Sequence, residues 1–127
     1  MKKFFTLLLA VISTMTAFAQ TEPAIELQAE VDGNTRTFTI GLATEGTVQI
    51  DWGNGEKVTS EVIPAYDGYN QVNVFGTVSG DGKVKIYGDN IVYFECSSRV
   101  DGAQVLSLDV TKATTLKDLT ANTNKLT

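Results

Sequence analysis

The chain has 127 residues, enough for one modest domain with a core of its own. It contains no histidine, which excludes His-based catalytic triads and His-ligated metal sites. Its formal net charge is −5, and loss of Lys2 and Lys3 with a signal peptide leaves eight basic and 15 acidic side chains, a charge of −7. Nucleic acid is therefore not an expected partner, because binding it needs clustered lysine and arginine.

The first 19 residues predict a secretory signal peptide. Lys2 and Lys3 precede an apolar run from Phe4 to Ile12, and small residues lead up to a cleavage point after Ala19. The apolar run is too short to span a bilayer. We therefore expect export to the periplasm, the outer surface or the medium, with no transmembrane segment in the mature chain. The residue directly after the cleavage point is not a cysteine, so lipid attachment there is not expected.

Residues 20–88 predict an antiparallel β-sandwich-like module. Apolar and polar residues alternate over 24–31, 37–43 and 47–52, which is the period of a strand with one buried face. Asn54-Gly55 closes a tight hairpin, and Pro64 ends the strand that follows it. Two more strands are expected around Val72 to Val78 and Val84 to Ile86. No segment has a convincing helical period, so the predicted fold class is mainly β, with about six strands in this module.

The stretch "IDWGNGEKV", residues 50–58, resembles the Trp-Gly-Asp-Gly hairpin of PKD-like β-sandwich domains, with Asn54 in place of the usual aspartate. The resemblance implies a PKD-like or immunoglobulin-like topology, with the tryptophan in the core and the glycines shaping the turn. Trp52 is in phase with Val48 and Ile50, which favours a core position over stacking on a sugar. Asp51, Asn54 and Glu56 lack the spacing of an EF-hand, so we interpret them as turn residues and predict no metal site.

Residues 89–127 have the spacing of a leucine-rich-repeat array. The pattern L-x-x-L-x-L-x-x-N-x-L is matched, with alanine in its third apolar place, by Leu116, Leu119, Ala121, Asn124 and Leu126. Val105 recurs as Leu126 after 21 residues. The sequence thus predicts an irregular capping unit over 89–104, one full repeat over 105–125, and the next repeat from 126.

The repeat spacing predicts which side chains point into the core and which cap backbone groups. Leu119 and Ala121 are expected to point inward from a short strand, Leu116 and Leu126 to enter from the flanking turns, and Asn124 to cap buried backbone groups. The return side of the coil is expected to consist of Val105, Leu108 and Val110. Ile91, Phe94 and Cys96 repeat the strand spacing upstream, with Arg99 in the asparagine place. Cys96 is thus expected to be a small buried hydrophobe, with no disulfide partner in the chain.

Taken together, the mature chain resembles the N-terminal part of secreted bacterial leucine-rich-repeat surface proteins. The resemblance rests on Lys85-Ile86-Tyr87-Gly88 and on the run Leu108-Asp109-Val110-Thr111-Lys112-Ala113, followed by Leu116 and Leu119. It implies an exported interaction or adhesion protein that binds a protein or glycan partner through the sheet of the repeats. The residues expected to face outward on that sheet, and so to bind, are Tyr93, Glu95, Ser97, Asp118, Thr120 and Asn122.

An alternative is a carbohydrate-binding β-sandwich module whose platform is the loop Tyr66-Asp67-Gly68-Tyr69-Asn70. The stop or continuation of repeats beyond residue 127 would distinguish the two functions. No G-x-S-x-G, Walker-type or G-x-G-x-x-G segment is present, so we predict no catalytic residues and no cofactor.

Overall fold

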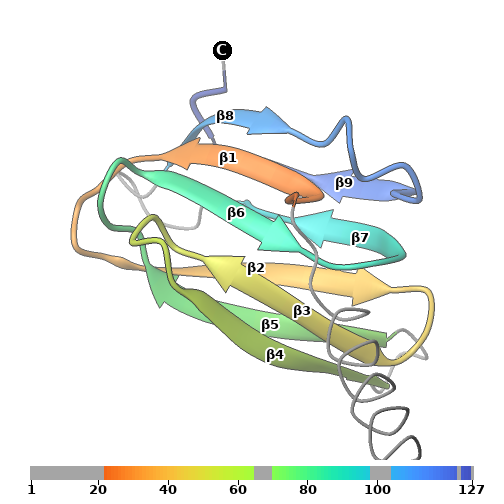
Figure 1. Cartoon of the computed structure of the whole chain (residues 1–127). Coiled ribbons are helices and arrows are strands. Elements are labelled where there is room, and N and C mark those ends of the chain that lie inside the picture. Colours follow the sequence, from red (N-terminus) through yellow and green to blue (C-terminus); the bar gives the residue numbers. More distant parts are fainter. Residues whose placement is uncertain (1–21, 65–69, 98–103, 123, 127) are drawn as a thin grey trace, which may run out of the picture.

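The computed structural model describes residues 22–64, 70–97, 104–122 and 124–126, which form a curled sheet of nine strands and contain no helix (Figure 1). The prediction of a mainly β fold is confirmed. The strands are β1 (Ile25–Ala29), β2 (Thr35–Leu42), β3 (Gly46–Asp51), β4 (Lys57–Pro64), β5 (Asn70–Thr77), β6 (Lys83–Tyr87), β7 (Ile91–Glu95), β8 (Val105–Asp109) and β9 (Asp118–Thr120).

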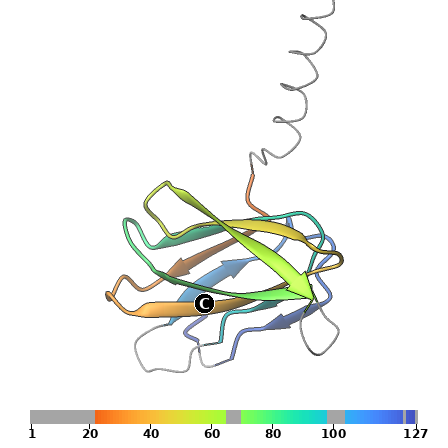
Figure 2. The ribbon, with the colours of Figure 1, turned by 90° about the horizontal axis from the view of Figure 1, so that it is seen from below.

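The strands are ordered β8-β1-β6-β3-β4-β5-β2-β7-β9 across the sheet. β4 joins two halves: it pairs along most of its length with β3, but with β5 only through Ile63 and Pro64. We call β8-β1-β6-β3-β4 the β1 half and β5-β2-β7-β9 the β2 half. The two halves curl around a common core, as the view from below shows (Figure 2). Six strands do occupy residues 22–88, but they belong to one continuous curled sheet.

The three strands after residue 88 extend this same sheet at its two ends. β7 pairs antiparallel with β2, and β8 pairs antiparallel with β1 in the other half. β9 then lies parallel to β7, with Phe94 opposite Leu119, an offset of 25 residues. The chain therefore runs from β7 in the β2 half to β8 in the β1 half, and then returns to the β2 half as β9, beside β7. The division into modules of 20–88 and 89–127 stays a prediction.

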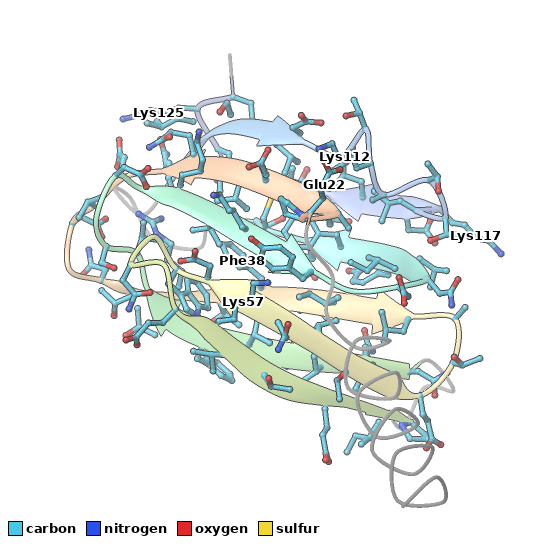
Figure 3. The ribbon with its side chains drawn as sticks, viewed as in Figure 1. Glu22, Phe38, Lys57, Lys112, Lys117 and Lys125 are labelled. Carbon is cyan, nitrogen blue, oxygen red and sulfur yellow. The ribbon has the colours of Figure 1, made fainter. Side chains whose placement is uncertain are left out.

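The core is built from the inward side chains of both halves, which alternate along each strand as the sequence predicts. Phe38 projects into it (Figure 3) and stacks on Trp52 with ring centroids 5.3 Å apart and planes 12° apart. Trp52 is 8% exposed and lies against Gly76, where an added Cβ would stand 2.1 Å from the indole ring. The tryptophan is thus a core residue, and Gly76 leaves the space for it.

The hairpin after β3 is shaped by backbone hydrogen bonds to one carboxylate. Asp51 Oδ1 accepts from the N–H groups of Gly53 at 2.9 Å and Gly55 at 3.0 Å, and both glycines have positive φ. Asn54 Oδ1 accepts from the Glu56 N–H at 3.0 Å. The polar cluster that could suggest calcium is therefore used to fold the turn. Within the described ranges, no group of three histidine, cysteine or acidic residues could hold a metal.

Candidate interaction face

The structure brings the six predicted surface residues together on the outward side of β7 and β9. Their parallel register sets Tyr93 opposite Asp118 and Glu95 opposite Thr120. Just beyond these strands, the backbone N–H of Asn122 donates to Ser97 Oγ at 3.1 Å. Two segments that are far apart in sequence thus form one small polar surface.

Strands β2 and β5 continue this surface. Thr39 lies opposite both Glu95 on β7 and Asn73 on β5, so all three side chains point outward in one row. We define the outer face as the outward residues of β5, β2, β7 and β9, together with one residue just beyond β7 and one just beyond β9. Its members are Gln71, Asn73, Phe75, Thr77, Thr35, Thr37, Thr39, Gly41, Tyr93, Glu95, Ser97, Asp118, Thr120 and Asn122. The repeat pattern could not reveal the β2 and β5 residues, because their membership depends on which strands pair. The sequence predicted β2 from the alternation along 37–43 and β5 from the valines between Val72 and Val78.

The outer face has a distinct composition. It contains acidic, amide and hydroxyl side chains and two aromatic rings, and none of its members is basic. Phe75 is 67% exposed, the largest exposed fraction among the large apolar side chains that the structure describes. Thr39 Oγ1 donates to Asn73 Oδ1 at 2.8 Å across β2 and β5. The face is therefore polar and acidic, with single apolar side chains that are not in contact with one another.

Tyr93 is held in place on the face by a hydrogen bond within its own strand. Its hydroxyl donates to Glu95 Oε2 at 2.9 Å, two residues further along the same strand. Because residues i and i+2 of a strand lie about 7 Å apart, this bond holds the ring along the strand. Burial and the Glu95 carboxylate raise the pKa of the Tyr93 phenol, whereas the Thr120 side chain acts in the opposite direction. The phenol therefore stays protonated at neutral pH and remains a donor to Glu95.

Gly41 on β2 lies opposite Tyr93 on β7, and a Cβ at position 41 would stand 2.9 Å from the Tyr93 Cβ. That distance is shorter than a stable carbon contact, so the glycine is required for this close approach. Gly41 is itself buried, so Tyr93 packs closely over the backbone of β2 at this position.

Asn124 fixes the C-terminal segment behind the face. Its Oδ1 accepts from the Val105 N–H at 3.0 Å, and its Nδ2 donates to the carbonyls of Cys96 at 3.0 Å and Ala121 at 3.2 Å. The amide thus connects β8 in one half with the ends of β7 and β9 in the other. The predicted capping of backbone groups by this asparagine is confirmed.

Two repeat leucines depart from their predicted places. Leu119 is 45% exposed and Leu126 is 44% exposed, although both were expected to be inside. For Leu119 the reason is positional, because β9 is an end strand and nothing in the described residues packs beyond it. Leu116 and Ala121 are partly buried against the core, as expected. On the return side, Val105 is buried, and Leu108 and Val110 pack partly against the core.

Cys96 directly follows the last residue of β7 and is 2% exposed. Burial, with a smaller contribution from the Glu95 carboxylate, raises the pKa of its thiol to about 11. A thiol in that state is a poor nucleophile. The prediction that it acts as a buried hydrophobe is confirmed.

A separate groove of about 630 Å³ lies on the β1 half, between the turn before β3 and the turn after β6. Its lining includes the carboxylates of Glu45 and Asp89 and the side chains of Gln49, Thr59 and Tyr87. Lys57 Nζ stands 4.0 Å from the centroid of the Tyr87 ring and so covers that ring with the chain's own cation. None of the six predicted surface residues lines this groove.

Some predicted positions lie outside the described residues. These are the signal peptide, the loop residues Tyr66 to Tyr69, and Arg99. In the part of the chain that is described, no helix is long and apolar enough to cross a membrane. No protein-family model matches the chain, and no curated protein or solved structure matches it significantly.

Proposed function

We propose that the chain is an exported, non-catalytic interaction protein that binds a protein or glycan partner through the outer face. The observation that supports this most is the parallel pairing of β7 with β9, which places Tyr93, Glu95, Asp118 and Thr120 side by side. Binding surfaces are commonly built in this way, with polar side chains held on a rigid sheet. In this proposal the chain is exported by its signal peptide, and the last unit is the beginning of a leucine-rich-repeat array.

Binding can be tested with matched triple variants. Asp118→Ala, Thr120→Ala and Asn122→Ala remove three side chains from the outer face. Thr47→Ala, Thr59→Ala and Glu61→Ala remove a similar set from the outward side of β3 and β4. The wild type and both variants, each without the signal peptide, would be applied to arrays of extracellular proteins and glycans. We expect partners whose signal falls in the first variant and persists in the second. Signals that are equal for both variants, with unchanged thermal midpoints, would contradict the proposal.

Export can be tested separately by expressing the whole chain in a bacterium and sequencing the exported product from its N-terminus. We expect the product to begin at Gln20. A chain that keeps Met1 to Ala19 and stays in the cytoplasm would contradict the export part of the proposal.

A further inference from the structure

We propose that the partner of the outer face is a neutral polysaccharide, with the Tyr93 ring as the platform on which one sugar ring stacks. This inference rests on the proposed function and names the chemical class of the partner. It follows from the orientation of the ring, from the hydrogen-bonding groups around it and from the charge of the face.

The orientation of Tyr93 suits stacking. A tyrosine ring held along a strand by its own hydroxyl has lost most of its side-chain freedom before any ligand arrives, so binding costs less conformational entropy. The C–H groups on one side of a pyranose ring pack well on an aromatic face, which carries negative charge density. Tyr93 is partly exposed, and its cross-strand neighbour Gly41 has no side chain that could compete with a sugar for the ring.

The groups around the ring can bind sugar hydroxyls. Glu95 uses Oε2 for Tyr93, and its other carboxylate oxygen has no partner in any hydrogen bond found among the described residues. Asn73 accepts from Thr39 through its Oδ1, which leaves its amide N–H donors for a ligand. Thr120 adds a hydroxyl on the other side of Glu95. Carboxylate acceptors make strong hydrogen bonds to hydroxyl donors, so a polyol ligand can be held without any apolar patch.

The composition of the face favours a sugar over a protein. The core of a protein interface is a contiguous apolar cluster with aromatic anchors. Here Phe75 lies two strands from Tyr93 and four residues further along, which places the two rings on the order of 15 Å apart. Two separated aromatic rings with polar side chains between them suit an extended oligosaccharide that contacts both rings. The absence of basic groups on the face, together with Glu95 and Asp118, disfavours sulfated or uronic acid polymers.

Affinity gel electrophoresis tests this inference. The purified chain without its signal peptide would be run in native gels that contain a soluble β-glucan, α-glucan, mannan, xylan or galactan. A gel with dextran sulfate, an anionic polymer, would be run alongside. We expect retardation in at least one neutral gel and none with dextran sulfate. Tyr93→Ala should weaken that retardation about tenfold in apparent Kd, whereas Tyr93→Phe, which keeps the ring, should weaken it less.

The control variants separate the possible outcomes. Thr39→Val, on the face, should weaken binding, and Thr59→Val, on the β1 half, should leave it unchanged. No retardation by any neutral polymer, equal retardation of wild type and Tyr93→Ala, or retardation by dextran sulfate alone would overturn the inference. A protein partner whose binding is lost with Asp118→Ala, Thr120→Ala and Asn122→Ala would uphold the proposed function while overturning its glycan form. Loss of folding in any variant is checked by its circular dichroism spectrum.

Discussion

Strands β7 and β9 have the same apolar spacing, yet their side chains end in different surroundings. Phe94 and Leu119 are opposite each other in the parallel register, but Phe94 is fully buried and Leu119 is 45% exposed. Cys96 and Ala121 occupy the next equivalent positions, and only Cys96 is fully buried. β7 lies between β2 and β9, whereas β9 has a neighbour on one side only among the described strands. The comparison teaches that a repeat pattern fixes which way a side chain points, while its burial depends on the neighbouring strand.

The largest expected difference between the two strands is in stability. Phe94→Ala removes a fully buried ring that also contacts Phe38, with centroids 5.7 Å apart, and should lower the free energy of unfolding by about 3–5 kcal/mol. Leu119→Ala should lower it by about 1 kcal/mol or less, because half of that side chain already faces solvent. Urea denaturation would measure both. Equal losses for the two variants would mean that β9 is as well covered as β7.

A substitution at Asn124 tests what holds the C-terminal segment to the ends of β7 and β9. Asn124→Ala leaves the Val105 N–H and the Cys96 and Ala121 carbonyls without this partner and should cost about 1–3 kcal/mol. Asn122→Ala is the matched control, since the bond at that residue uses its backbone N–H, and it should cost less than about 0.5 kcal/mol. Thermal unfolding would compare the two. If Asn122→Ala cost as much as Asn124→Ala, the cap would not be what holds the end segment.

Thiol reactivity distinguishes the equivalent positions 96 and 121 directly. In the native protein Cys96 should react very slowly with Ellman's reagent at pH 8, because the thiol is buried and its pKa is raised. In the double variant Cys96→Ala, Ala121→Cys the new thiol is only partly covered and should react faster. Equal slow rates in the native state, both becoming fast in urea, would show that the two positions are equally protected.

The raised pKa of Cys96 also predicts a small effect of pH on stability. The thiol is protonated in both states below its unfolded value of about 9, so its contribution is fully present there. As the pH rises toward 11, the unfolded chain loses this proton first and stability falls. Cys96→Ala removes this part of the dependence, so the stability curve of the variant should fall less steeply between pH 9 and 11. Stability curves of equal slope for the wild type and Cys96→Ala in this pH range would contradict a raised pKa of the Cys96 thiol.

The sequence predicted local features well. The alternation over 24–31, 37–43 and 47–52 corresponds to β1, β2 and β3, and Pro64 is the last residue of β4. The spacing of Phe94 and Leu119 anticipated the register between two strands that are 25 residues apart. Asn124 caps backbone groups because a single amide can both donate and accept. Each of these features depends on residues that are close in sequence or on an internal repeat.

Apart from β7 and β9, the sequence did not predict which strands would be neighbours. That β8 pairs with β1, and β2 with β7, depends on the whole set of packed side chains, and no local pattern encodes it. The contribution of Thr39 and Asn73 to the outer face was therefore missed, as was the exposure of Leu119. The division into a sandwich and a separate array was drawn where the apolar spacing of the sequence changes, and it stays a prediction.

The parallel register of β7 and β9 is the central claim, because the outer face exists only if these strands pair as described. Nuclear Overhauser effects between the backbone protons of the two strands, in the isotopically labelled chain without its signal peptide, measure it directly. We expect cross-strand effects that connect Phe94 with Leu119 and their immediate neighbours in a parallel pattern. Their absence, an antiparallel pattern, or a register that places Tyr93 away from Asp118 would contradict it.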